Sequence, residues 1–137
     1  MKKIYLFIVF SFIVNYANAQ LTDVVSTYGS PTALLKSGTD FYVAHSYPNA
    51  SRISKFDITD TNPTLIHLMF STSGDDFFLE PSDIALHGNN MYIADFSSSN
   101  IYKLNITDTN PVLTSVSNPS QPKALLLNGD ILYISSG

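Results

Sequence analysis

The stretch ISKFDITDTNPTL at residues 53–65 decides the fold, because it occurs again as IYKLNITDTNPVL at residues 101–113. Nine of the thirteen positions are identical at an offset of 48 residues. Residues 53–58 and 101–106 alternate apolar and polar side chains, as a half-buried β-strand does. The TDTNP segment then favours a turn, since Asp and Asn bond their own backbone and Pro fixes φ. Such self-similarity indicates a repeat architecture built from short strands.

A second motif occurs three times and predicts a hairpin in each unit. Pro31, Pro81 and Pro122 are each followed seven residues later by a glycine, and then by an apolar run that contains a tyrosine. The runs read FYVA at 41–44, MYIA at 91–94 and LYIS at 132–135. An apolar stretch, a glycine turn and a tyrosine run together predict an antiparallel hairpin. The first two runs are continuous rather than alternating, so both faces of these strands are expected to be covered.

The remaining segments complete a unit of four strands. A fourth strand is expected at residues 64–70 and again at 112–116, and no window shows a sustained helical period. Four antiparallel strands in a repeat of about 40–50 residues are typical of a β-propeller blade. The sequence therefore predicts an all-β fold, a partial β-propeller with about two and a half four-stranded antiparallel blades. The units span about residues 31–70, 81–117 and 122–137, with 21–26 as the outer strand of a preceding blade.

Residues 1–19 have the pattern of a cleaved signal peptide. Lys2 and Lys3 precede an apolar run from Ile4 to Val14, and residues 17–19 read ANA, which suits signal peptidase. The run is shorter than the roughly 20 residues that a membrane-spanning helix needs. The mature chain, residues 20–137, is therefore expected to be secreted, extracellular or at the cell surface, or else periplasmic. No membrane span is expected once the signal is removed.

Composition and charge exclude several classes of function. The chain has no cysteine, which excludes disulfides, thiolate zinc sites and a cysteine nucleophile. All eleven acidic residues follow the signal peptide, where five basic residues remain, so the mature chain has a net charge of −6. A nucleic-acid partner is not expected, because neutralising phosphates requires a basic face.

The connector STSGDDFFLE at residues 71–80 departs most strongly from the repeat. It and the residues just after it supply four carboxylates and two aromatic rings, from Asp75, Asp76, Phe77, Phe78, Glu80 and Asp83. Carboxylate oxygens suit a hard cation such as calcium, and an acidic groove with an aromatic rim suits a sugar or a peptide. The alternative is a solvated acidic loop with its phenylalanines packed under a blade. Asp95, which replaces His45 of the preceding unit, is a further candidate ligand-binding residue.

Other residues with functional chemistry do not form a recognisable site. His45, His67 and His87 fall at different positions of the unit, so they cannot be repeated ligands. His45 and His87 could meet on one face, but a zinc site would need a third ligand, and packed or surface histidines are expected. Asp60 and Asp108 recur in the turns and are interpreted as turn formers. No catalytic residue is assigned and no cofactor is expected, with calcium the one ion left open.

Taken together, the motifs resemble the NHL-like repeat propellers of secreted proteins from Bacteroidetes-type bacteria. The resemblance covers residues 21–137 and rests on the three hairpin motifs and the Ile-x-Lys-x-(Asp/Asn)-Ile-Thr-Asp-Thr-Asn-Pro repeat. It implies a binding or protein-interaction scaffold whose ligand is an unknown protein or carbohydrate.

Two alternatives remain open, a propeller hydrolase of the calcium-dependent lactonase type and a structural cell-surface or adhesion protein. The resemblance favours an enzyme less, because such lactonases carry acids and an Asn on their innermost strands, where this chain has Leu34, Ile84 and Leu125. A propeller closes with roughly four to eight blades, so two and a half blades predict either part of a longer protein or self-association.

Overall fold

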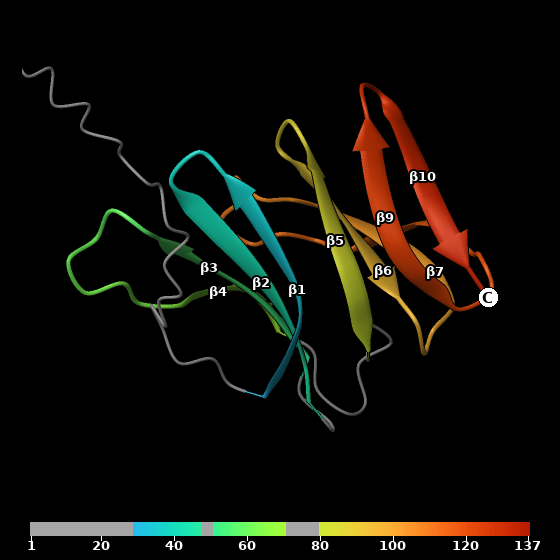
Figure 1. The fold of residues 1–137 in the computed structure, drawn as a ribbon, viewed down its shortest axis with the longest axis horizontal. Coiled ribbons are helices and arrows are strands. Elements are labelled where there is room, and N and C mark those ends of the chain that lie inside the picture. The colour runs from blue at the N-terminus through green and yellow to red at the C-terminus, as the bar shows by residue number, and fades with distance from the viewer. Residues whose placement is uncertain (1–28, 48–50, 71–79) are drawn as a thin grey trace, which may run out of the picture.

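The computed structural model describes residues 29–47, 51–70 and 80–137, which form three antiparallel sheets (Figure 1). The first contains, in spatial order, β1 (Ser30–Ser37), β2 (Asp40–Ser46), β3 (Arg52–Asp57) and β4 (Ile66–Phe70). The second contains β5 (Pro81–His87), β6 (Asn90–Asp95), β7 (Asn100–Asn105) and β8 (Thr114–Ser117). The third is a hairpin of β9 (Pro122–Asn128) and β10 (Ile131–Ser136). These segments contain no helix, so the all-β prediction is confirmed.

The three hairpins share one register. Pro31 pairs with His45 across β1 and β2, and Pro81 pairs with Asp95 across β5 and β6. Each two-residue turn begins with a glycine of positive φ, near 60°, at Gly38, Gly88 and Gly129. This is the geometry of a type II′ turn, in which the first position favours glycine. The predicted glycine turn is therefore present in every unit.

The fourth strands begin two residues later than the sequence predicts. β4 starts at Ile66 and β8 at Thr114, whereas strands were expected from residues 64 and 112. The turn after β3 is held by a hydrogen bond from the Ile58 N–H to the Thr39 carbonyl, at 3.0 Å. The Pro63 nitrogen has no hydrogen to donate to a ladder, so strand pairing resumes beyond it.

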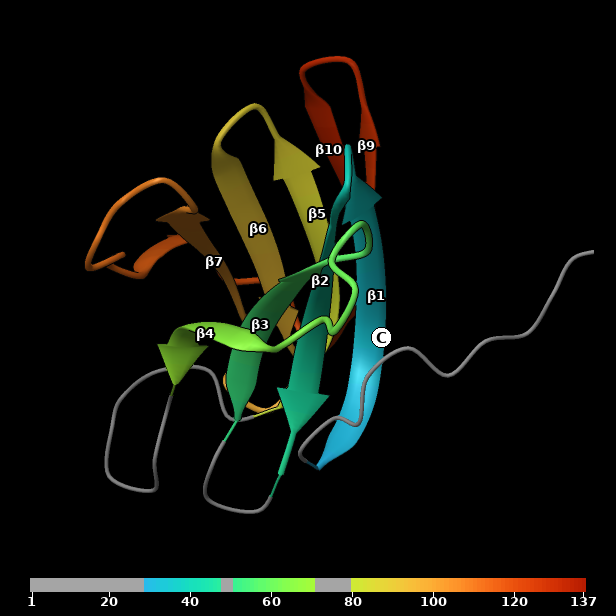
Figure 2. The ribbon, with the colours of Figure 1, turned by 90° about the vertical axis from the view of Figure 1, so that its left-hand side faces the viewer.

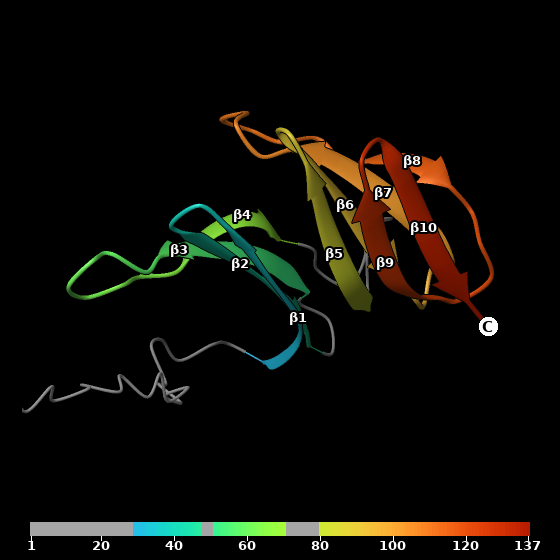
Figure 3. The ribbon, with the colours of Figure 1, turned by 45° about the horizontal axis from the view of Figure 1, so that its top comes forward.

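The sheets stack in chain order with their first strands side by side. β1 contacts β5, and β5 contacts β9 (Figures 1 and 3). Figure 2 shows that the strands of the first and second sheets run in the same order away from this line. The first strands of the three sheets, β1, β5 and β9, therefore lie in one row, and the later strands of each sheet lie progressively farther from this row.

Every sheet turns the same face toward the next one. Tyr42, Ala44 and Ile53 of the first sheet pack against the opposing side chains of the second, which include Ile84, Met91, Ile93, Tyr102 and Leu104. Because side chains alternate along a strand, Ala94 and Ile101 lie on the opposite face of the second sheet. That face meets the third sheet, since Asp83, opposite Ala94 in the register, bonds to β9. The second sheet is therefore covered on both faces.

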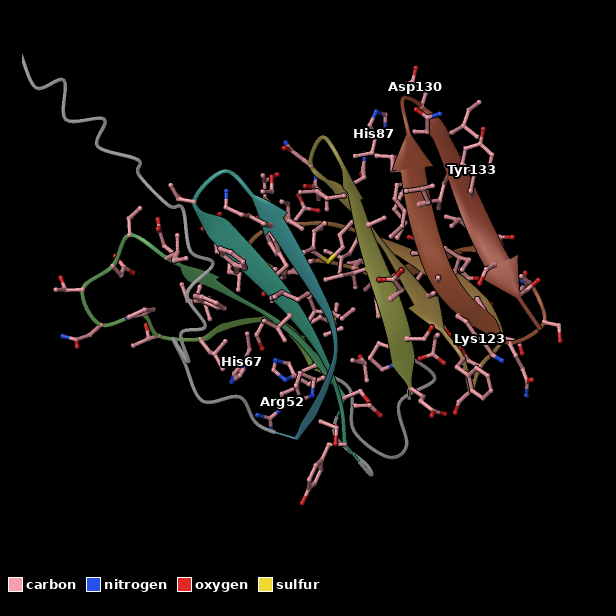
Figure 4. All side chains as sticks on the ribbon, in the orientation of Figure 1. Arg52, His67, His87, Lys123, Asp130 and Tyr133 are labelled. Atoms are coloured by element: carbon pink, nitrogen blue, oxygen red, sulfur yellow. The ribbon has the colours of Figure 1, made fainter. Side chains whose placement is uncertain are left out.

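Polar contacts join the second sheet to the third. The Leu125 N–H donates to Asp83 Oδ2 at 2.7 Å, and the Ser82 hydroxyl donates to the Pro122 carbonyl at 2.7 Å. At the hairpin turns, His87 Nε2 lies 3.1 Å from Asp130 Oδ1 (Figure 4). The β5–β9 contact is thus fixed near both ends of the strands.

Equivalent residues differ in burial according to their neighbours. Leu34 is 64% exposed, whereas Ile84, at the same position of the next unit, is buried between sheets. Tyr42 is 3% exposed and Tyr133 is 51% exposed, although both occupy the same register position. The repeat therefore predicts where a residue sits in its hairpin, and the stacking decides how much of its side chain is covered.

Candidate functional site

The predicted acidic site falls partly within the structure. Glu80, Asp83 and Asp95 are described, whereas Asp75, Asp76, Phe77 and Phe78 lie outside the described residues. Among the described side chains, no group of three or more His, Cys, Asp or Glu residues could hold a metal ion.

Asp95 is a buried acceptor that shapes the backbone. Its Oδ2 accepts from the Glu80 N–H at 2.9 Å, and its Oδ1 accepts from the Ser98 N–H at 2.8 Å. The carboxylate therefore ties the start of β5 to the turn between β6 and β7. Bonds of this kind, from N–H groups to a charged acceptor, are among the stronger hydrogen bonds in proteins. Asp95 thus has a structural role in this arrangement.

Glu80 and Asp83 differ in what they offer a ligand. Asp83 accepts from the Ile84 N–H at 2.8 Å and from the Leu125 N–H, so both of its oxygens already have backbone donors. Glu80 is exposed, and its Oε2 accepts a hydrogen bond from the Ser97 hydroxyl at 2.7 Å. Of the three described acids among the predicted ligand-binding residues, Glu80, Asp83 and Asp95, Glu80 is the one that is exposed.

The structure reveals a polar cluster on the outer face of the first sheet that sequence reasoning missed. His45 pairs with Arg52 across β2 and β3, and Ser54 pairs with His67 across β3 and β4. Because side chains alternate, His45, Arg52 and Ser54 lie on the face turned away from the second sheet. Ser54 Oγ lies 2.8 Å from His67 Nδ1, within hydrogen-bond distance. Figure 4 labels Arg52 and His67 in this part of the sheet.

His45 is the most unusual member of this outer-face cluster. It is 1% exposed, and among the residues that the structure describes neither ring nitrogen has a hydrogen-bond partner. Burial, together with the nearby His67 and Arg52, lowers the pKa of the His45 imidazole, which favours a neutral ring at pH 7. A neutral imidazole offers one donor and one acceptor, so a polar group that reached His45 would find both.

The Ser54–His67 pair has the two groups of an activated hydroxyl. Ser54 is completely buried, however, so its hydroxyl has no exposure to an incoming substrate. In this arrangement the pair satisfies two polar groups within the sheet.

A position-by-position comparison of the two repeats would have signalled this cluster. Each residue of the cluster in the first unit is replaced by a different residue at the equivalent position of the second unit. The replacements are His45 by Asp95, Arg52 by Asn100, Ser54 by Tyr102 and His67 by Ser115. In the second unit Asn100 Oδ1 accepts from the Ser115 hydroxyl at 2.9 Å and also from the Asn118 side chain. The two units therefore carry different polar networks at one structural position.

The histidines do not meet as the sequence interpretation allowed. His87 lies beside the hairpin turn and pairs with Asp130, whereas His45 lies at the far end of β2, near His67. The equivalence of the two hairpins therefore places His45 and His87 at opposite ends of the sheets.

Comparison with models of protein families and with curated proteins finds no match to this chain. Its function is inferred from its own geometry. Within the described ranges, no helix is long and apolar enough to cross a membrane.

Proposed function

We propose that this chain is a binding or protein-interaction scaffold, built as part of an NHL-like β-propeller whose sheets act as blades. The proposal draws on one observation above the others: the first strands β1, β5 and β9 lie side by side, and each sheet turns the same face to its successor. Propeller blades stack in this manner around a central axis. A rigid stack of this kind positions connecting loops for recognition.

The two ends of the sheets differ in how strictly they repeat. At one end, each hairpin has a two-residue turn, and eight residues join the third strand to the fourth in both complete units. At the other end, ten residues join β4 to β5, but only four join β8 to β9. We call this second end the connector end. Because loops that vary on a constant scaffold commonly carry binding, the connector end is the proposed binding surface.

Backbone geometry at the connector end supports this assignment. Ser99 and Gln121 both have positive φ, 53° and 44°, although neither is glycine. The Gln121 N–H donates to the Ser99 hydroxyl at 3.3 Å, so the two connectors are linked. Left-handed backbone in non-glycine residues is uncommon and occurs preferentially at functional sites.

The chemistry of the connector end suits a polar ligand with an apolar part, such as a peptide or a carbohydrate. Glu80 presents an exposed carboxylate, and Lys123 Nζ lies 5.9 Å from the centre of the Phe96 ring. Ligand-binding sites commonly combine aromatic surface with a few oriented polar groups. The lactonase alternative gains no support from Asp83, whose oxygens are occupied by backbone donors.

Binding is tested by selecting ligands for the full chain from a displayed-peptide library and a glycan array. Glu80→Ala and Lys123→Ala are each expected to weaken binding of the selected ligand by about tenfold, because each removes one charged hydrogen-bonding group. Asp130→Ala, at the hairpin end and 93% exposed, is the matched control. If Asp130→Ala weakens binding and the two connector variants do not, the binding surface has been placed at the wrong end.

Export is part of the same proposal. The chain is expected to leave the cytoplasm with Gln20 as its first residue, which N-terminal sequencing of the exported protein measures. Recovery of the protein in the cytoplasm with residues 1–19 intact would contradict this.

A further inference from the structure

We propose that the outer-face cluster of the first sheet binds the carboxylate group of a ligand, through His45, Arg52 and His67. This site belongs to the connector end, so it rests on the proposed function and adds the chemical class of group that is bound there.

The three side chains come together where the strands of the first sheet reach the connector end. His45 is next to the last residue of β2, and Arg52 is the first residue of β3. Arg52 lies opposite His45 on one side and opposite Phe70, the last residue of β4, on the other. His67, opposite Ser54, lies just inside this end on β4. Three adjacent strands therefore contribute one side chain each.

His45 is the member of the site with unused hydrogen-bonding groups. Its side chain is buried, and among the described residues neither ring nitrogen has a hydrogen-bond partner. Buried polar side-chain atoms in proteins nearly always have one. The neighbouring guanidinium of Arg52 carries donors and no acceptor, so a ligand group that bridges Arg52 and His45 has to be an acceptor.

The charges around the site favour an anion. Burial lowers the pKa of His45, and the charges of His67 and Arg52 lower it further, so positive charge already collects here. The described acids of the first sheet all lie toward its hairpin end, away from the cluster: Asp40, Asp57 and Asp60. An anionic group is therefore the ligand that this end of the sheet attracts.

The second unit has a carboxylate of its own at the equivalent place. Asp95, which corresponds to His45, is completely buried, and its oxygens accept from two backbone N–H groups. Beside it, Asn100 accepts a hydrogen bond from Ser115. The first unit has an imidazole and a guanidinium at these two positions. A ligand carboxylate supplies the missing acceptor oxygens, and it matches the fork of a guanidinium through two parallel hydrogen bonds.

This position stays open to solvent even where another sheet packs on the same face. The first sheet packs on the corresponding face of the second, yet Ser115, equivalent to His67, is exposed, and Asn100 is half-buried. In the first sheet His67 is likewise exposed and Arg52 half-buried. A ligand therefore reaches the site past His67, at the outer strand of the sheet.

The probe is acetate, titrated into the full-length protein at constant pH and ionic strength. The readout is the imidazole nitrogen NMR signals of His45 and His67, assigned by their loss in His45→Leu and His67→Ala. Both signals are expected to shift and to saturate. Arg52→Gln is expected to weaken acetate binding by about tenfold, and Arg52→Lys, which keeps the charge without the planar fork, is expected to weaken it as well.

Lys36→Gln is the matched control for Arg52→Gln. It removes the same charge from the same sheet, but at an exposed position of the hairpin end, and it is expected to leave acetate binding unchanged. Signals that do not move at millimolar acetate would overturn the proposal. Equal weakening by Lys36→Gln and Arg52→Gln would do so too, because acetate would then respond only to the overall charge. Tighter binding of inorganic phosphate than of acetate would replace the carboxylate by another anion.

Two further titrations identify the source of the carboxylate. A glutamate-containing peptide with blocked ends represents a protein partner, and glucuronate represents an acidic sugar; tighter binding of either one than of acetate supports the site and names its ligand. If acetate does not bind while Glu80→Ala and Lys123→Ala still weaken the selected ligand, the carboxylate site is wrong and the proposed function stands. If those variants have no effect either, the proposed function falls with it.

Discussion

Replacing Asp83 by alanine tests whether the stacking of sheets depends on a specific polar bridge. Asp83 accepts from the Leu125 N–H at 2.7 Å and from the Ile84 N–H at 2.8 Å. Loss of a hydrogen bond to a charged group costs about 1.5–3 kcal/mol, and the local Ile84 bond adds less. We therefore expect Asp83→Ala to lower the free energy of unfolding by about 2–4 kcal/mol. Alanine already occupies this position in the other hairpins, as Ala33 and Ala124, so it fits without distortion.

The assay is urea denaturation followed by tyrosine fluorescence, since the chain has eight tyrosines and no tryptophan. With a urea dependence of about 1.5 kcal/mol/M, the midpoint is expected to fall by about 1.3–2.7 M. Thr64→Ala, at an exposed position between the turn and β4, is the control and is expected to change stability by less than about 0.5 kcal/mol. If Asp83→Ala shifts the midpoint no more than this control, the bridge contributes nothing and the sheets are held by apolar packing alone.

Three further predictions concern the titration of Asp57 and His45 and the exposed side chain of Leu126 on the third sheet. Hydrogen bonds from Thr59 lower the pKa of the exposed Asp57 carboxyl in the folded chain. The ionised carboxylate therefore stabilises the fold above its pKa in the unfolded chain, about 3.9, and this stabilisation is lost as the pH falls through its pKa in the folded chain. Asp57→Asn is expected to keep the turn, because Asn105 makes the same hydrogen bonds in the second unit. In urea denaturation at pH 2–5 this variant is expected to lack the loss of stability that the Asp57 carboxyl causes. A variant that is unfolded at pH 7 would refute this. The pKa of buried His45 is lowered, so as the pH falls the unfolded chain takes up a proton before the folded chain does. The free energy of unfolding is therefore expected to decrease as the pH drops below about 6.5, and His45→Leu is expected to abolish this dependence on pH. An unchanged dependence in the variant would assign it to other groups. Leu126 is 66% exposed on the last sheet, and Leu126→Lys is expected to reduce binding of a hydrophobic dye while changing stability by under about 0.5 kcal/mol; undiminished dye binding would show that another surface is responsible.

The strand pattern was predictable because it depends on local signals. The alternation at residues 101–106 and the glycine turns identify β7 and the hairpins without any knowledge of distant contacts. The start of β4 was predicted two residues early, because the extent of the TDTNP turn depends on how the Ile58 N–H reaches the neighbouring turn. Such a bond between segments distant in sequence leaves no local pattern.

The site was less accessible to sequence reasoning. Asp95 attracted attention as an unrepeated acid, but its two oxygens are used by the backbone, which no spacing rule reveals. The grouping of His45 with Arg52 and His67 depends on strand register and on the shift between Ile53 and Ser54 that brings His67 opposite Ser54. A one-residue slip would place His67 on the other face, so its position could not be derived from composition.

The sheets all turn the same face forward, and this has a consequence for how such a molecule changes over generations. Because both junctions join the forward face of one sheet to the rear face of the next, a duplicated unit would meet its neighbours with the same kinds of face, and a deleted one would leave a forward face against a rear face. The number of sheets can therefore change by whole units while each junction keeps the same pair of faces. Two forward faces, by contrast, do not match each other, so sheets can be added to the stack in one orientation only.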